Sequence, residues 1–239
     1  TFRLESIEGL AIEDLKSRQR NLCAGLEAVF SQKITNDPMN RLLLGANLSW
    51  EAVDLFRAIF GYARQLELSF NIAQVQAILL SSPQTTHQLW NFFETKFKPN
   101  ITNRSKSLKS SREAVEDSIR NLETQSQDLI FRCFFNLIDS MFRTNFFKDN
   151  RKEHYISFKI NCAQVHQMPG QRMMYEVYVH HRYMEGIHLR GGKVARGGIR
   201  WSDRTDFRRE ILDLVSTQMI KNVLIVPEGS KGGFRMKEQ

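Results

Sequence analysis

The residues best suited to chemistry lie near the C-terminus, where glycines alternate with basic side chains. Two glycine pairs sit inside basic runs, at Arg190–Lys193 (RGGK) and at Arg196–Arg200 (RGGIR). Glycine lets backbone N–H groups approach an anion closely, and the flanking Arg and Lys add positive charge. The same residues also suit two tight turns in a basic hairpin, and the residues alone do not separate these interpretations.

A second feature is the face of a helix expected from about Asp203 to Asn222. At 100° per residue one stripe is apolar at its start and polar at its end: Phe207, Ile211, Leu214, Gln218 and Lys221. Gln218 and Lys221 are three residues apart, so their side chains are neighbours. A lysine on an inward face needs a partner. As a surface charge, Lys221 would instead be stabilised by the partial negative charge of the helix C-terminus.

The third feature is the segment Gly229–Gly233 (GSKGG), directly after a run that we expect to be a buried strand, Val223–Val226. Ligands of α/β folds bind at the carboxyl ends of strands, so a site is expected here, with Lys231 in it. The spacing is not that of a P-loop, and the chain contains no GxGxxG dinucleotide fingerprint.

Other catalytic arrangements are not supported. His180, His181 and His188 have no Cys or carboxylate at metal-ligand spacing, so we expect no metal site. The three cysteines match neither a disulfide framework nor a zinc pattern, and we interpret them as small buried side chains in a reducing compartment. No Ser/His/Asp arrangement for nucleophilic catalysis is apparent.

The elements that must position these residues begin with helices over residues 1 to about 97. Asn21–Phe30 is apolar at Leu22, Leu26 and Phe30. Ser49 is placed to cap a helix with Val53, Phe56, Phe60 and Ala63 inside, and Asn71 to cap the next. A third helix runs from about Thr86 to Pro99.

Two further expectations concern the middle of the chain. The stretch 98–112 is basic and poor in hydrophobic residues, which favours a solvated linker over an anion-binding arm, because no aromatic side chains are interleaved with the charges. Helical spacing then predicts one long helix from about 111 to 146, with Thr124–Ser126 as its weakest part.

After residue 150 the pattern changes to strands. Tyr155–Ile160, Met174–His180, Ile187–Arg190 and Gly198–Trp201 are expected strands, followed by the helix and the strand already named. The sequence therefore predicts an α+β chain: a helical bundle over 1–150 and a partial α/β domain with a mixed sheet over 151–239. A sheet that has only begun predicts a fragment of a longer protein.

Composition limits the classes of function. The 239 residues carry 34 Lys and Arg against 26 Asp and Glu, a net charge of +8, with a pI near 9.5. No apolar run approaches the ~18 residues of a membrane span, and Thr1–Glu5 does not begin a signal peptide. The basic balance suits nucleic acid, a membrane surface or small anionic substrates equally.

Taken together, these segments resemble the glutamate dehydrogenases, most closely the large NAD-dependent type. The resemblance is sharp over GIHLRGGKVARGGIRWSDR, from Gly186, and over REILDLVSTQMIKNVLIVPEGSKGGF, from Arg209. It is diffuse over NRLLLGANLSW, from Asn40, and RTNFF, from Arg143. The activity it implies is reversible oxidative deamination of L-glutamate to 2-oxoglutarate and ammonium, with NAD as the hydride acceptor.

The resemblance also implies residue roles. Lys231 matches the catalytic lysine that polarises the substrate carbonyl and an attacking water. Gln218 and Lys221 match residues that hold the substrate α-carboxylate. Arg196 matches a third basic group, and Gly197 and Gly198 match glycines that let the backbone approach the substrate.

The sequence departs from the family pattern at two positions, and some parts of the family's active site are expected outside this chain. Glu228 replaces a usual glycine, and Arg196 stands where the small enzymes have lysine, which changes the geometry offered to a carboxylate. The catalytic aspartate and the nucleotide-binding domain are expected outside this chain, so we expect the chain alone to be inactive. The resemblance further implies a cytoplasmic homo-oligomer that binds neither nucleic acid nor membrane.

Two alternatives remain. One is an amino-acid dehydrogenase for another substrate, such as leucine or phenylalanine, because the side-chain pocket depends on residues mostly absent here. The other is a basic nucleic-acid-binding or scaffolding module that uses residues 98–112 and 190–209, whose binding would fall steeply with salt.

Overall fold

A computed structural model of the chain describes residues 12–148, 154–193, 197–221 and 229–237. Its elements, in chain order, are α1 Ile12–Phe30, the 3-10 turn Pro38–Arg41, α2 Leu42–Gly45, α3 Trp50–Gln65, α4 Ile72–Ser81, α5 Pro83–Phe97, α6 Arg104–Arg120, α7 Gln125–Ser140, β1 Met141–Thr144, β2 Ile156–Asn161, the 3-10 turn Cys162–Gln164, β3 Tyr175–His180, β4 Met184–Arg190, β5 Ile199–Trp201, α8 Phe207–Lys221 and β6 Ser230–Met236. The α+β class expected from the sequence is confirmed.

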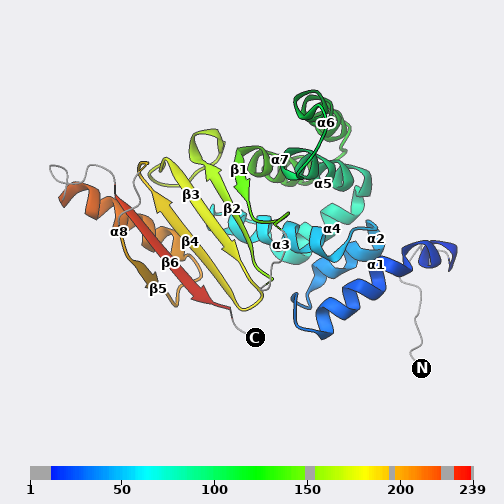
Figure 1. Ribbon diagram of the computed structural model, residues 1–239, viewed down its shortest axis with the longest axis horizontal. Coiled ribbons are helices and arrows are strands. Elements are labelled where there is room, and N and C mark those ends of the chain that lie inside the picture. The colour runs from blue at the N-terminus through cyan, green and yellow to red at the C-terminus, as the bar shows by residue number, and fades with distance from the viewer. Residues whose placement is uncertain (1–11, 149–153, 194–196, 222–228, 238–239) are drawn as a thin grey trace.

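The six strands form one mixed sheet in the order β1-β2-β3-β4-β6-β5. In the first five strands of this order, from β1 to β6, neighbouring strands are antiparallel. The edge strand β5 pairs parallel to β6. Figure 1 shows α3 and α8 behind the sheet and the remaining helices gathered to one side. No helix of the described residues covers the face of the sheet that is turned toward the viewer.

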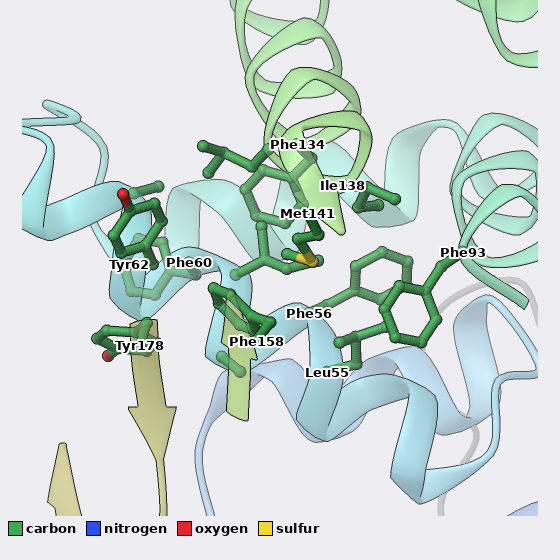
Figure 2. Packing of buried hydrophobic residues seen from close by; sticks show 14 of the residues in the cluster. Leu55, Phe56, Phe60, Tyr62, Phe93, Phe134, Ile138, Met141, Phe158 and Tyr178 are labelled. Carbon is green, nitrogen blue, oxygen red and sulfur yellow. The ribbon is translucent and has the colours of Figure 1, made fainter. Parts of the chain in front are cut away.

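The hydrophobic core is shared by the helices and the sheet. Phe56 and Tyr62 of α3, Phe134 of α7, and Phe158 and Tyr178 of the sheet are all at most 1% exposed. Figure 2 shows these side chains packed against one another between the helices and the strands. Burial of this aromatic cluster fixes the sheet against α3, which in turn supports α8.

Local capping signals predicted the first helices correctly. The Ser49 side chain accepts a hydrogen bond from the backbone N–H of Ala52 at the start of α3. Asn71 and Gln74 form a reciprocal capping box at the start of α4. In α1, however, Leu26 and Phe30 are 45% and 78% exposed, so the apolar spacing there does not point into the core of this chain.

The linker expected over 98–112 is wrong in its second half, because α6 begins at Arg104. Its basic residues make structural contacts. Arg104 donates to the carbonyl oxygens of Lys96 and Lys98 and so satisfies the C-terminal end of α5. Arg112 forms an ion pair with Asp139 of α7.

The single helix expected over 111–146 is also wrong. It is interrupted between Arg120 and Gln125, where the Thr124 side chain and Gln127 form a capping box that starts α7. Thr124 caps a new helix because its hydroxyl satisfies a backbone N–H that a helix start would otherwise leave unpaired. The helix then ends at Ser140 and the chain continues directly as β1.

The remaining expectations are met in part. The four strands expected between residues 155 and 201 are present as β2 to β5. The strand expected at Val223–Val226 and the boundary expected at residue 150 lie outside the described residues. Strand β1 already precedes that boundary, and the division into two domains there stays a prediction.

Candidate functional site

Lys231 is the second residue of β6, which lies between β4 and β5. The segment Gly229–Gly233, which we expected to follow a strand, therefore lies mostly within one. In register, Lys231 is opposite Leu189 of β4, a core residue, so its side chain leaves the sheet on the face that the helices cover. Lys231 is half-buried and forms no ion pair with any residue that the structure describes, whereas Arg235 on the same face lies 2.7 Å from Glu185.

The glycine pair at 197–198 lies against β6 beside Lys231. A Cβ atom on Gly197 would fall 1.8 Å from the carbonyl oxygen of Ser230, a distance that no side chain tolerates. The backbone N–H of Gly232 donates to the carbonyl oxygen of Gly198 at 3.0 Å. A Cβ on Gly198 would meet no atom within 4 Å, so only Gly197 is required by close packing.

Helix α8 brings Gln218 to the same end of β6. A Cβ on Gly229 would lie 3.5 Å from the Gln218 side-chain oxygen, and one on Gly233 would lie 2.5 Å from Ile211. These glycines let α8 lie close on the strand. Phe207 and Ile211 of the predicted stripe are fully buried, Leu214 is half-buried, and Val215, which the stripe omitted, is also fully buried.

Two expected site residues, Lys221 and Arg196, are only partly placed or not placed, and the same holds for Glu228, which replaces a usual glycine. Lys221 is the last residue of α8, on the same helix end as Gln218, and the structure describes only its backbone. Arg196 and Glu228 lie outside the described residues. The structure therefore brings together Gly197, Gly198, Gln218 and Lys231.

Ser230, the neighbour of Lys231 in β6, was not among the expected site residues. Ser230 is fully buried, and its hydroxyl has no hydrogen-bond partner in the part of the chain that the structure describes. This hydroxyl would lie 3.4 Å from a Cβ on Gly197, so it faces the glycine pair. A serine between a glycine and a lysine gives no signal in the sequence that distinguishes it from a turn residue.

A buried ionic network holds the start of α8. The Arg208 guanidinium donates to both carboxylate oxygens of Glu176, at 2.7 and 3.0 Å, and Tyr62 donates to the same carboxylate at 2.8 Å. Burial alone would lower the pKa of Arg208, but hydrogen bonding to Glu176 raises it above its ordinary value. Burial and the Glu176 charge raise the pKa of Tyr62 far above its usual range.

The sequence analysis expected a strand here but did not predict this network, although the alternation of residues in β3 contains the signal for it. Glu176, Tyr178 and His180 alternate with half-buried residues, so a carboxylate and an imidazole must both enter the core. His180 lies 3.3 Å from Asp54, and burial lowers its pKa. His180 is therefore a buried residue with a hydrogen-bonding partner.

Asp54 lies in a charged cluster of its own. Burial would raise the pKa of Asp54, but His180 and Arg57 lower it to about 2. Arg57 also pairs with Asp37 at 2.6 Å. Beyond His180, the Lys237 ammonium donates to the carbonyl oxygen of His181, and burial lowers the pKa of Lys237 to about 8.

The cysteines are only partly as expected. Cys162 is buried and Cys133 is half-buried, and burial raises the pKa of both thiols, that of Cys133 to about 11. Such thiols are unreactive as nucleophiles. Cys23 is exposed on α1, so the expectation that all three are buried is wrong for this residue. No helix in the described part of the chain is long and apolar enough to cross a membrane.

Comparison with known proteins gives two family matches. Residues 114–239 match the bacterial NAD-glutamate dehydrogenase catalytic domain, and residues 34–99 match helical motif 3 of glutamate dehydrogenase. The chain is 36% identical over 241 aligned positions to the NAD-specific glutamate dehydrogenase of Pseudomonas aeruginosa, covering 98% of this chain and 15% of the relative. The enzyme of the same name from Mycobacterium tuberculosis is 37% identical over 220 positions, covering 88% of this chain and 13% of the relative.

A third relative, the NAD-specific glutamate dehydrogenase of Halomonas elongata, is 36% identical over 215 positions, which cover 88% of this chain and 13% of that protein. The chain thus spans about one seventh of the length of these curated relatives.

Proposed function

Since the chain belongs to the bacterial NAD-glutamate dehydrogenase family, we propose that it supplies the lysine-bearing half of a substrate site for reversible oxidative deamination of L-glutamate. The observation that carries the proposal is the convergence of Gly197, Gly198, Gln218 and Lys231 at one end of β6. A glutamate or 2-oxoglutarate molecule has two carboxylates, and this end of the sheet has an unpaired lysine among the described residues.

In this proposal each residue has a separate role. Lys231 stabilises the developing negative charge on the carbonyl oxygen of the substrate and orients the attacking water. Gln218 and Lys221 hold the α-carboxylate, because one offers an amide N–H and the other a cation from the same end of α8. Arg196 adds a third cation, and Gly197 keeps the backbone close to β6 so that no side chain blocks the substrate.

The cofactor is NAD, and when bound it accepts the hydride removed from the substrate. We propose that other parts of the complete enzyme bind it and supply the acid–base carboxylate, because no dinucleotide fingerprint occurs in this sequence. We also propose that the complete enzyme is a cytoplasmic homo-oligomer. Sedimentation of the full-length protein at several concentrations tests the oligomer, since self-association must rise with concentration.

The test of the function is NADH oxidation by the full-length protein with 2-oxoglutarate and ammonium. Lys231→Ala should lower kcat by roughly 100- to 10,000-fold, the usual range for loss of one group that acts in the transition state. The matched control is Lys106→Ala, an exposed lysine of α6, which should leave kcat unchanged.

Other outcomes are equally informative. Turnover of Lys231→Ala near that of the unaltered protein would contradict the role of Lys231. The unaltered protein could instead be active with the oxo acid of leucine or phenylalanine but not with 2-oxoglutarate. That result would support the proposed dehydrogenase reaction and contradict glutamate as its substrate.

A further inference from the structure

A cavity of about 710 Å³ opens on the helix-free face of the sheet, where β1 and β2 meet the end of α5. This size is within the range of pockets that bind small molecules, about 300–1,000 Å³. Four cations line it, namely Arg143, Lys148, Lys159 and Arg190, and none of the described lining residues is acidic.

The register of the sheet explains why the cations gather. Arg143 of β1 is opposite Lys159 of β2, and Lys159 is opposite Val177 of β3. Arg190 of β4 is opposite Tyr175, two residues before Val177 in β3. Because residues opposite one another point to the same face, the three basic side chains leave the sheet together.

This face is the opposite one from the candidate substrate site. Arg190 is opposite Ser230 in β6, while Lys231 is opposite Leu189, and adjacent residues of a strand point to opposite faces. The cavity is therefore a separate feature of the molecule. Its lining includes Arg190 of the Arg190–Lys193 run (RGGK), and the proposed function gives Arg190 no role.

The cations of the cavity lack compensating charges. None of the four forms an ion pair with a carboxylate that the structure describes, and the Arg190 Nε atom is buried without a hydrogen-bond partner among those residues. The Lys159 ammonium lies 4.1 Å from the ring centre of Tyr175 and 5.0 Å from that of Phe142. Burial, Arg190 and Arg143 together lower the pKa of Lys159, as expected where like charges are close.

We propose that this cavity binds a small anion with two or more negative charges, presented as phosphate or carboxylate groups. Arginine offers a planar pair of donors that fits either group, and a lysine between two arginines adds a point charge. The anion would reduce the repulsion among the cations, which no carboxylate of the described residues compensates. Phe97, Pro99 and Phe147 also line the recess, so its charged part is limited to the four cations, which suits a compact anion.

The experiment is isothermal titration calorimetry on the full-length protein with two probes, inorganic pyrophosphate and tricarballylate, which separate a phosphate from a polycarboxylate preference. Lys159→Gln should weaken binding of the preferred probe about tenfold or more, the usual effect of losing one charged hydrogen bond. Lys159→Arg keeps the charge and should retain most of the affinity. Lys106→Gln makes the same change of charge on the exposed surface of α6 and should have no effect.

The readout is binding, so the result does not depend on the dehydrogenase reaction. Circular dichroism of each variant establishes that it is folded, and Arg190→Gln provides a second variant if Lys159→Gln is not. Absence of binding of both probes at millimolar concentration, or equal affinity of Lys159→Gln and the unaltered protein, would overturn the proposal. Tighter binding of a short single-stranded oligonucleotide that pyrophosphate does not displace would overturn it in favour of nucleic acid.

Discussion

The buried ion pair between Arg208 and Glu176 is the interaction whose loss should destabilise the protein most. Arg208 is 2% exposed and Glu176 0%, and two hydrogen bonds join them. In Arg208→Met, Glu176 would keep only the hydrogen bond from Tyr62. Breaking one partner of a buried pair typically costs about 3–5 kcal/mol, most of it from leaving the other charge buried without compensation.

The assay is urea unfolding of Arg208→Met, Glu176→Met and the double variant, read as the midpoint and slope of each transition. Because the double variant buries no unpaired charge, its loss of stability should be smaller than the sum of the two single losses by at least about 2 kcal/mol. Arg209→Met, an exposed neighbour on α8, is the control and should change stability by less than about 0.5 kcal/mol. A loss below about 1 kcal/mol for Arg208→Met, or additive losses in the double variant, would refute the reasoning.

Two further predictions follow from contacts described above. Gly197→Ala should separate β5 from β6 and reduce both stability and turnover, because its Cβ would lie 1.8 Å from the Ser230 carbonyl oxygen, whereas Gly198→Ala should be close to neutral; equal thermal unfolding midpoints for the two variants would contradict this. Asp54 has a pKa lowered from 3.8 to about 2, so it stabilises the fold by about 2 kcal/mol above pH 4, and this contribution is lost as the pH falls from 4 to 2. Unfolding free energies measured across that window should show a smaller acid loss in Asp54→Asn, and identical pH profiles would contradict the assignment.

Local capping signals allowed α3 and α4 to be predicted from the sequence. A cap such as Ser49 or Asn71 acts on backbone N–H groups two or three residues away, so the sequence contains both partners. The failures have long-range causes. The basic residues at the start of α6 contact other helices: Arg112, for example, pairs with Asp139 of α7, which is distant in sequence. A charge run examined locally resembles a linker because such partners are not visible in it.

The glycine-rich segment was misassigned for a related reason. Glycine is unfavourable in strands, and the sequence placed Gly229–Gly233 after a strand rather than within one. Most of it is strand because it pairs with β4 and β5, which are distant in sequence. Gly233 also leaves room for Ile211 of α8. The candidate site was more accessible to sequence reasoning, since helical periodicity alone put Gln218 at the inner end of α8.

The order of strands in the sheet has a consequence for synthesis on the ribosome. Strands β1 to β4 form a meander in which each strand pairs with its predecessor, so it can assemble as it emerges. Strand β5 is different, because its only neighbour in the described sheet is β6, which is made after it. At about 5–20 residues per second, a nascent chain must hold β5 and α8 without their sheet partner for roughly seconds. Ile199 and Trp201 of β5, which stay largely exposed in the described structure, add apolar surface available to chaperones during this interval. The strand that carries Lys231 is the last of the described strands to be made.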